Sequence, residues 1–318
     1  MNQFTVSSSP HITAHKTTHT VMRDVLIALI PASIAAIVIF GWYSLALIAI
    51  SVASAVLSEF VFNLICKKEQ TIYDLSAAVT GLILALNLPT SVALWQAAIG
   101  AVIAIVVVKC LFGGIGQNFA NPAIVARIVL FLSFSDSMAK NPTPTFTLVD
   151  SVSGATPLAV LGGAEGTLPS MTQLLFGLYG GAIGETCSIA LLIGLVYLLC
   201  RKVITWHIPV AFVATVAILT LGANPIYQIF SGGLLIGAIF MATDYVTSPA
   251  TPWGKIIFGI GCGLITVLIR LFGNYPEGVS FGILLMNILT PYIEKWTVRR
   301  PLGSFSAKKK TKKEGEAK

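Results

Sequence analysis

Apolar stretches long enough to cross a membrane follow one another along almost the whole chain, from Val21 to Ile293. A helix needs about 20 residues to cross the hydrocarbon core of a bilayer. Only 10% of the 318 residues are charged, whereas a soluble domain has about 25%. We therefore predict an all-α integral membrane protein with about ten transmembrane helices. The long runs are 25–42, 44–65, 94–112, 185–199, 204–221, 256–272 and 281–293, and the short or glycine-interrupted runs are 75–88, 122–134 and 229–242.

A weak internal repeat suggests how these helices are arranged. Gly81-Leu-Ile-Leu-Ala-Leu and the later Leu111-Phe-Gly are echoed by Gly233-Leu-Leu-Ile-Gly-Ala and Leu271-Phe-Gly. Five crossings in each half are an odd number, so the two halves would run through the bilayer in opposite directions. Such inverted five-helix repeats, with short or re-entrant central helices, are similar to urea and ammonium channels. Chance likeness between leucine- and glycine-rich helices is the alternative.

The lysines and arginines predict the orientation of the chain. With ten crossings, nearly all of them fall on the side of the two termini, which the positive-inside rule makes cytoplasmic. We expect a cytoplasmic arm (1–20), a first five-helix repeat (21–134), an extracytoplasmic loop (135–171), a second repeat (172–295) and a basic, disordered cytoplasmic tail (296–318). Attraction of the tail to anionic membrane lipid is enough to explain the net charge of +7. The charge therefore gives no reason to expect binding to nucleic acid.

The outer loop contains the string Asp150-Ser-Val-Ser-Gly-Ala-Thr156-Pro157. A phosphoester to a threonine needs an exposed hydroxyl, small neighbours and backbone outside regular structure. Ser153, Gly154, Ala155 and Pro157 are residues that supply these conditions. An ordinary surface turn is the alternative interpretation.

Several further strings, in order along residues 9–294, extend a family resemblance beyond this loop. With the loop, they are similar to the RnfD/NqrB family of membrane flavoproteins, and the short amino terminus is typical of the RnfD branch. Asp244-Tyr245 departs from the family pattern, which has Asp followed by Pro. The strings are Ser9-Pro-His, Met22-Arg-Asp-Val, Asp74-Leu-Ser-Ala-Ala-Val-Thr-Gly with Leu88-Pro, Phe112-Gly-Gly-Ile-Gly-Gln-Asn-Phe-Ala-Asn-Pro-Ala, Gly184-Glu-Thr, Ala242-Thr-Asp-Tyr-Val-Thr-Ser-Pro and Tyr275-Pro-Glu-Gly.

The resemblance implies that a flavin transferase attaches FMN covalently to Thr156, with Asp150, Ser153, Gly154 and Ala155 as the acceptor motif. It also implies an electron-relay subunit, not catalytic alone, of the Rnf ferredoxin:NAD oxidoreductase complex in the bacterial cytoplasmic membrane. Iron–sulfur and flavin centres, with the ferredoxin and NAD sites, would lie on partner subunits, and electron flow would drive Na⁺ or H⁺ export. The chain itself has no nucleotide-binding glycine loop.

Four polar residues within or beside the spans are candidates for further flavin contacts. Asn118, Asn121 and Arg127 lie where the related NqrB holds a noncovalent riboflavin, although both asparagines could instead cap a break in the backbone. Arg270 could bind the FMN phosphate or pair with Glu277.

Two carboxylates suggest an ion path. Glu185 begins a span, and Asp244 lies beside Thr243, Thr247 and Ser248, whose oxygens suit a hard cation. Alternatively, Glu185 caps its helix and Asp244 organises the turn before Pro249. We expect no resident metal and no iron–sulfur cluster, because the five cysteines are scattered without a C-x-x-C spacing.

A ten-helix channel or facilitator for a small solute, without redox activity, is the alternative function. Flavin fluorescence of the denatured chain would separate the two, since only the redox subunit carries a covalent flavin.

Overall fold

A computed structural model describes residues 17–140, 142, 144, 156–273 and 278–298. These residues form helices and connecting loops, and they contain no β-strand. Three of the helices are long and apolar enough to cross a membrane, namely α1 (Thr18–Phe40), α2 (Trp42–Ile65) and α13 (Pro252–Phe272). The prediction of an all-helical protein with membrane-spanning segments is therefore confirmed.

The remaining elements are shorter. The first half contains η1 (Ile72–Asp74), α3 (Ser76–Leu86), α4 (Leu94–Val102), the π-helix η2 (Ile103–Cys110), α5 (Pro122–Ser133) and α6 (Ser135–Ala139). The second contains α7 (Pro157–Leu161), α8 (Met171–Phe176), α9 (Ser188–Cys200), α10 (His207–Leu219), α11 (Pro225–Phe230), α12 (Leu234–Ile236), the π-helix η3 (Gly237–Met241) and α14 (Val279–Thr297).

Local sequence explains where several helices begin and break. The Thr17 hydroxyl accepts a hydrogen bond from the backbone N–H of Thr20 (3.3 Å), so α1 begins well before the apolar run that predicted it. Gly41, with φ of 77°, separates α1 from α2. The predicted span 229–242 is broken because Gly232 and Gly233 both adopt positive φ, which only glycine adopts at low cost.

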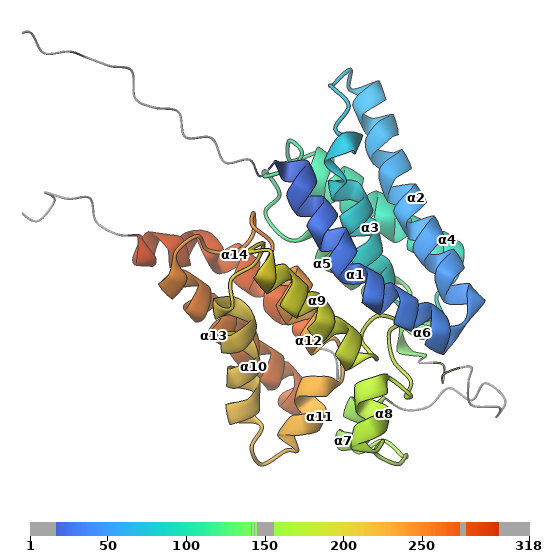
Figure 1. The fold of residues 1–318 in the computed structure, drawn as a ribbon, viewed down its shortest axis with the longest axis vertical. Coiled ribbons are helices and arrows are strands. Elements are labelled where there is room, and N and C mark those ends of the chain that lie inside the picture. The colour runs from blue at the N-terminus through green and yellow to red at the C-terminus, as the bar shows by residue number, and fades with distance from the viewer. Residues whose placement is uncertain (1–16, 141, 143, 145–155, 274–277, 299–318) are drawn as a thin grey trace, which may run out of the picture.

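The helices pack as two groups (Figure 1). In the first, α2 packs against α3 and α4; in the second, α13 packs against α10 and α14. Contacts between α1 and α9 and between α5 and α14 join the groups. The start of α1 and the end of α14 lie on the upper left side of Figure 1, whereas α7, α8 and α11 lie on the lower side. The short helices α7, α8 and α11 therefore lie at the end away from the start of α1.

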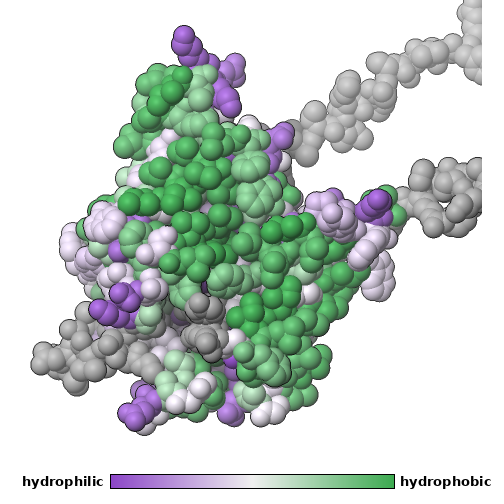
Figure 2. All heavy atoms as spheres, turned by 180° about the vertical axis from the view of Figure 1, so that it is seen from behind, coloured by the Kyte–Doolittle hydropathy of each residue, from purple (hydrophilic) through white to green (hydrophobic). Residues whose placement is uncertain are grey.

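The outer surface of the helices is strongly apolar (Figure 2). Side chains such as Ile34, Leu57, Leu64 and Val196 are more than half exposed. Hydrophobic side chains cover this face almost continuously, and the strongly polar residues lie towards its ends. An uninterrupted apolar surface of this kind is stable only against lipid or another protein.

Candidate functional site

Thr156 is the N-cap of the short helix α7. Its Oγ1 accepts a hydrogen bond from the backbone N–H of Ala159 (3.2 Å), and Pro157 occupies the first helical position. The residue is only 8% exposed. The expectation of an exposed hydroxyl is therefore wrong for this conformation, because the threonine that ends the loop also starts a helix. The acceptor-motif residues Asp150, Ser153, Gly154 and Ala155 lie outside the described residues.

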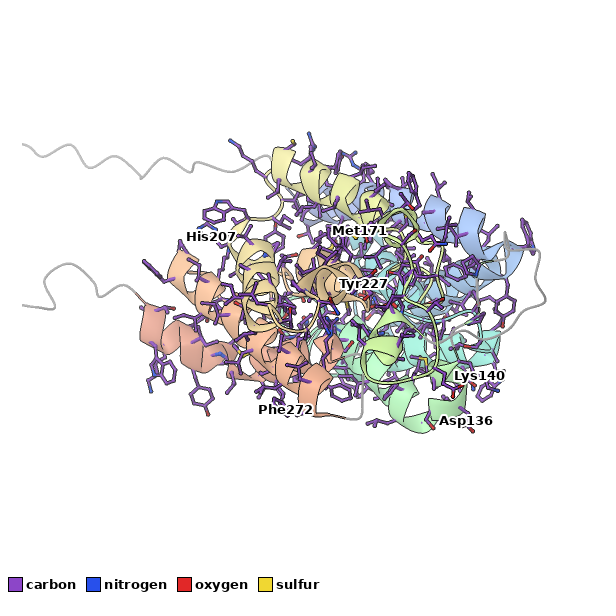
Figure 3. The ribbon with its side chains drawn as sticks, turned by 90° about the horizontal axis from the view of Figure 1, so that it is seen from below. Asp136, Lys140, Met171, His207, Tyr227 and Phe272 are labelled. Carbon is purple, nitrogen blue, oxygen red and sulfur yellow. The ribbon has the colours of Figure 1, made fainter. Side chains whose placement is uncertain are left out.

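A cavity of about 350 Å³ lies beside α7. This volume is within the usual range for small-molecule sites, about 300–1,000 Å³. The cavity is closed on one side by α7, where Leu158 packs directly over the Cα of Gly232. Its lining is mixed polar and apolar: Leu158, Leu161, Gly162, Ala223, Asn224, Gln228, Arg270 and Leu271. The structure thus brings the predicted residue Arg270 next to the helix that Thr156 begins. Figure 3 shows the molecule from below, with Tyr227 of α11 and Phe272 at the end of α13 labelled.

The Arg270 guanidinium is held by backbone oxygens at the end of α11. Nη1 donates to the side-chain Oε1 of Gln228 (3.1 Å) and to its carbonyl, and Nη2 donates to the carbonyls of Gly232 (2.9 Å) and Ser231 (3.3 Å). These carbonyls lie where the chain breaks between α11 and α12, so the arginine satisfies groups that a helix end leaves without partners. Glu277, the predicted ion-pair partner, lies outside the described residues.

A second, smaller cavity of about 110 Å³ lies between the two groups of helices, and we call it the central cavity. Asn118 and Asn121 both line it. Asn121 caps α5, since its Oδ1 accepts from the N–H of Ala123 (3.0 Å), and its Nδ2 donates to the carbonyl of Met241 (3.2 Å). Asn118 donates to the carbonyl of Ala120 (3.0 Å). The capping interpretation is confirmed for Asn121, and both asparagines also face the cavity.

A buried ion pair that the sequence interpretation missed borders this cavity. Lys109, on the π-helix η2, donates to Oε1 of Glu59 (2.8 Å) and to Oγ of Ser76 (2.7 Å). The hydroxyl of Thr71 also donates to the Glu59 carboxylate. Glu59 and Lys109 are 1% and 4% exposed. Glu59 lies inside a predicted apolar span, where a charge is stable only if it is paired, and that was the signal available in the sequence.

Arg127 and Glu185 are buried and lie on either side of Gly233. Arg127 on α5 donates to Oγ of Ser280 on α14 (2.7 Å), and Glu185 accepts from the N–H of Ala182 (3.1 Å). A side chain at Gly233 would lie 3.1 Å from Oε2 of Glu185 and 3.7 Å from Nη1 of Arg127, so both charged groups flank this glycine. The capping interpretation of Glu185 is wrong, because α9 begins only at Ser188 and has Cys187 as its N-cap. Glu185 instead belongs to a buried irregular segment.

Asp244 lies on the wall of the central cavity, whose lining residues do not include Glu185. It accepts from Oγ1 of Thr247 (3.3 Å) and from the N–H of Val246 (3.5 Å), so it organises the turn before Pro249 as one alternative expected. Burial raises the pKa of this carboxyl above its ordinary 3.8, and the hydrogen bonds oppose part of the rise. The Tyr245 hydroxyl, where the family pattern has proline, donates to the carbonyl of Val203.

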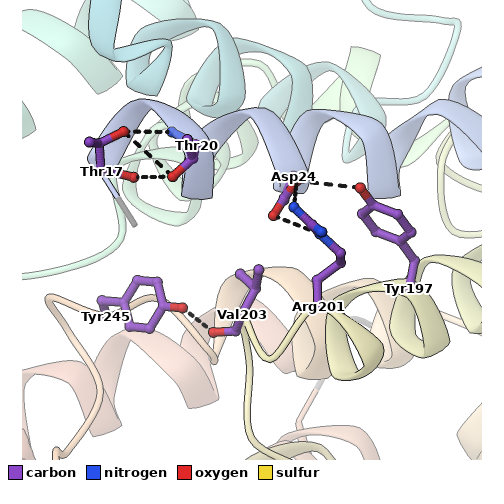
Figure 4. Close-up of polar contacts among 7 residues, drawn as sticks. All are labelled: Thr17, Thr20, Asp24, Tyr197, Arg201, Val203 and Tyr245. Carbon is purple, nitrogen blue, oxygen red and sulfur yellow. Dashed lines mark hydrogen bonds and ion pairs between the residues drawn. The ribbon is translucent and has the colours of Figure 1, made fainter. Parts of the chain in front are cut away.

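Polar contacts tie the two groups together beside the central cavity (Figure 4). Asp24 on α1 accepts from Nε (3.2 Å) and Nη2 (3.4 Å) of Arg201 and from the hydroxyl of Tyr197 (3.3 Å). The carboxylate raises the pKa of Arg201 through these hydrogen bonds and its charge. The contacts fix α1 against the end of α9.

No group of three or more His, Cys, Asp or Glu side chains within the described residues is arranged to hold a metal ion. The cysteines are free, and Cys110 and Cys262 are buried.

Comparisons with known proteins give one consistent result. A family model described as the NQR2, RnfD, RnfE family matches residues 5–303. The chain is 49% identical to the D subunit of the Na(+)-translocating ferredoxin:NAD(+) oxidoreductase complex of Acetobacterium woodii, covering 97% of this chain and 98% of that one. It is 40% identical to the D subunit of the proton-translocating ferredoxin:NAD(+) oxidoreductase complex of Clostridium ljungdahlii, covering 93% and 95%. It is 34% identical to the D subunit of the ion-translocating oxidoreductase complex of Alcanivorax borkumensis, covering 96% and 98%.

Proposed function

This chain belongs to the NQR2, RnfD, RnfE family, and we propose that it is the electron-relay subunit of a membrane-bound, ion-translocating ferredoxin:NAD oxidoreductase complex, with FMN bound through a phosphoester to Thr156. The subunit is not catalytic alone. Ferredoxin and NAD bind to other subunits, and the coupling ion is Na⁺ or H⁺, the two ions that appear in the names of its relatives.

The observation that carries the flavin proposal is the cavity beside α7. Thr156 starts the helix whose Leu158 and Leu161 line this cavity, and Asn224, Gln228 and Arg270 line it too. Apolar side chains suit the faces of a flavin ring, whereas the guanidinium and amides suit its polar edge or its phosphate. When bound, the flavin supplies a group that accepts and passes on electrons.

The buried Thr156 hydroxyl requires a change of conformation before it can react. We propose that the flavin transferase acts while the first turn of α7 is open, either before α7 packs or during local opening. Five residues make a short helix with few hydrogen bonds of its own, so opening it mainly disrupts the packing of Leu158 against Gly232. In this transfer a flavin nucleotide that carries FMN in a pyrophosphate bond donates its FMN phosphoryl group to Oγ1. The pyrophosphate P–O bond breaks, the nucleoside monophosphate leaves, and the hydroxyl proton of Thr156 passes to solvent.

The membrane topology that we propose agrees with attachment of the flavin outside the cytoplasm. We propose ten crossings in two inverted halves, with both termini in the cytoplasm and Thr156 on the outer side of the bacterial cytoplasmic membrane. The distribution of lysine and arginine supports this orientation. So does the position of α7 and α8 at the end away from the start of α1. A flavin in this location needs a covalent link because a free one would be lost to the medium.

A noncovalent riboflavin in the central cavity is a less complete fit. The donor set suits it, since Asn118, Asn121 and Lys109 all reach the wall. At about 110 Å³, however, the cavity is smaller than the usual range for sites of such ligands, so side chains would have to move apart. We propose Asp244 on this wall and Glu185 near Arg127 as separate points of the ion path, because they do not share a site.

In-gel fluorescence tests the proposal. The complex is purified from cells that contain a flavin transferase, denatured, and separated on a gel. We expect a fluorescent band for the wild-type chain, loss of at least nine-tenths of the signal in Thr156→Ala, and partial retention in Thr156→Ser, which keeps a hydroxyl. A fluorescent Thr156→Ala band would reject the site. A dark wild-type band together with solute flux in liposomes would instead support the channel function.

A further inference from the structure

The loop formed by residues 111–120 closes the central cavity and also carries an exposed apolar surface; we call it the roof loop. Ile115 and Asn118 line the cavity on the inner side of the roof loop. On the outside, Leu111, Phe112 and Phe119 are 65%, 50% and 45% exposed. Ile115 contributes to both sides of the loop, since it lines the cavity and is also 39% exposed. A molecule seated on the roof loop would therefore lie directly over the cavity.

The aromatic side chains of the roof loop form a fixed pair. The rings of Phe112 and Phe119 have centroids 5.0 Å apart at an angle of 51°. Between them, Gly114 and Gly116 adopt φ of 103° and 88°, and a side chain built at either would have no atom within 4 Å. The glycines thus leave bare backbone between two exposed rings. Aromatic side chains beside an accessible backbone are typical of protein interfaces.

The roof loop is unsuited to the lipid core. Its backbone is irregular, held by turn contacts such as the N–H of Gly114 donating to the carbonyl of Lys109 (3.0 Å). Lipid-exposed irregular backbone does not occur within the hydrocarbon region, so the loop lies at the level of water or headgroups. There, exposed phenylalanines are stabilised by burial against a partner.

The charges around the cavity mouth define that partner. Residues from the start of α1 and the segment after α9 line the cavity together with the roof loop, so all three segments border the same cavity. In these three segments the exposed charged side chains are Arg23, Arg201 and Lys202, whereas Asp24 is buried and paired with Arg201. An acidic side chain nearby is Asp74 of η1, which contacts α1 and is only partly exposed. A surface with a basic rim around an apolar centre is complementary to one with an acidic rim.

We propose that the roof loop is a docking surface for an acidic, water-soluble face of another subunit of the complex, which covers the central cavity. The identity of the partner as a subunit of the complex rests on the proposed function. The site that it covers is separate from Thr156, which begins a helix at the other end of the molecule.

Thiol labelling of the assembled complex tests this proposal. In a chain whose five cysteines are replaced by serine or alanine, Gln117→Cys places a thiol on the exposed roof loop, and Lys295→Cys places a matched exposed thiol at the end of α14. We expect the ratio of maleimide labelling rates, Gln117→Cys to Lys295→Cys, to fall at least tenfold from the isolated chain to the assembled complex. We also expect Phe112→Ala with Phe119→Ala to lower the recovery of other subunits by a similar factor, while Phe119→Tyr retains them.

Other occupants of the surface give distinct results. Protection of Gln117→Cys in the isolated chain by vesicles of anionic lipid alone would identify a lipid surface and overturn the proposal. Protection that accompanies a doubled mass of the isolated chain would identify a second copy and overturn it too. An unchanged ratio in a complex that assembles normally rejects only the docking proposal. If the wild-type chain recovered no other subunit, the proposed function itself would fail.

Discussion

Replacing Lys109 with methionine removes one member of the buried pair and leaves the Glu59 carboxylate without its countercharge. At 2.8 Å and an effective dielectric constant of about 20, the attraction between the two charges is about 6 kcal/mol before desolvation is subtracted. Removal of one partner from a buried pair typically costs about 3–5 kcal/mol. Without Lys109, the hydroxyl of Thr71 still donates to Oε1 of Glu59, but it carries no countercharge, and among the described residues Oε2 has no hydrogen-bond partner. We expect the free energy of unfolding of Lys109→Met to fall by about 3–5 kcal/mol.

The assay is thermal unfolding in detergent, followed by a dye that fluoresces on reaction with thiols. Cys110 and Cys262 are buried and become reactive when the helices separate. The expected loss corresponds to a decrease in Tm of about 6–20 °C on the scale of soluble domains. Glu59→Gln keeps the shape of the side chain but leaves Lys109 unpaired, so it should cost about as much. Lys68→Met, at an exposed position, should stay within about 0.5 kcal/mol of wild type.

The double variant Glu59→Met with Lys109→Met decides whether the pair or the volume matters. Apolar replacement of both members of a buried pair is often close to neutral. We therefore expect the double variant to be more stable than either of its own single variants, Glu59→Met and Lys109→Met, by about 2 kcal/mol or more. If the losses of the single variants simply add in the double variant, the two charges do not interact and the reasoning is refuted.

Three further outcomes follow from the structure. The pKa of Asp244 is raised above 3.8 in the folded state, so the folded protein keeps a proton that the unfolded chain loses. The stability of wild type relative to Asp244→Asn should therefore fall as the pH rises from 3.8 through the raised pKa. If the difference in Tm between the two proteins does not change across this pH range, the burial argument is contradicted. Gly184→Ala places a methyl group 2.5 Å from Cβ of Leu86 and should cost about 1–3 kcal/mol in the same assay, whereas a wild-type Tm would mean that α3 yields easily. Thr251→Ala removes the cap that accepts from the N–H of Gly254 (3.1 Å) and should cost about 0.5–2 kcal/mol, with Thr251→Ser close to wild type.

The sequence predicted the helices well because apolar length is a local property of the chain. Helix boundaries depended on single residues that a hydropathy pattern does not weigh. Thr17 extended α1 towards the amino terminus by capping it, and Glu185 lay outside α9 because its segment is fixed by contacts elsewhere. The backbone N–H of Ile183 donates to the carbonyl of Leu88 (3.1 Å), and that of Gly184 to Leu86 (2.8 Å), about a hundred residues earlier in the chain.

The candidate site likewise has features that follow from local sequence and features that depend on contacts between distant residues. The string around Thr156 could be proposed as a site from the sequence because small residues and a proline beside one hydroxyl form a local pattern. The burial of that hydroxyl was not, since it depends on α7 packing through Leu158 against Gly232. Glu59 and Lys109, fifty residues apart, meet only because α2 and the π-helix η2 lie side by side.

By itself, therefore, the sequence determined that this protein is helical, lies in a membrane and belongs to the NQR2, RnfD, RnfE family, since hydropathy and motif strings are written in neighbouring residues. Only the tertiary structure decided which charges neutralise one another and where space remains. Ion pairing in a medium of low dielectric constant and the shape of a cavity depend on distances between helices, and no single stretch of the chain contains those distances.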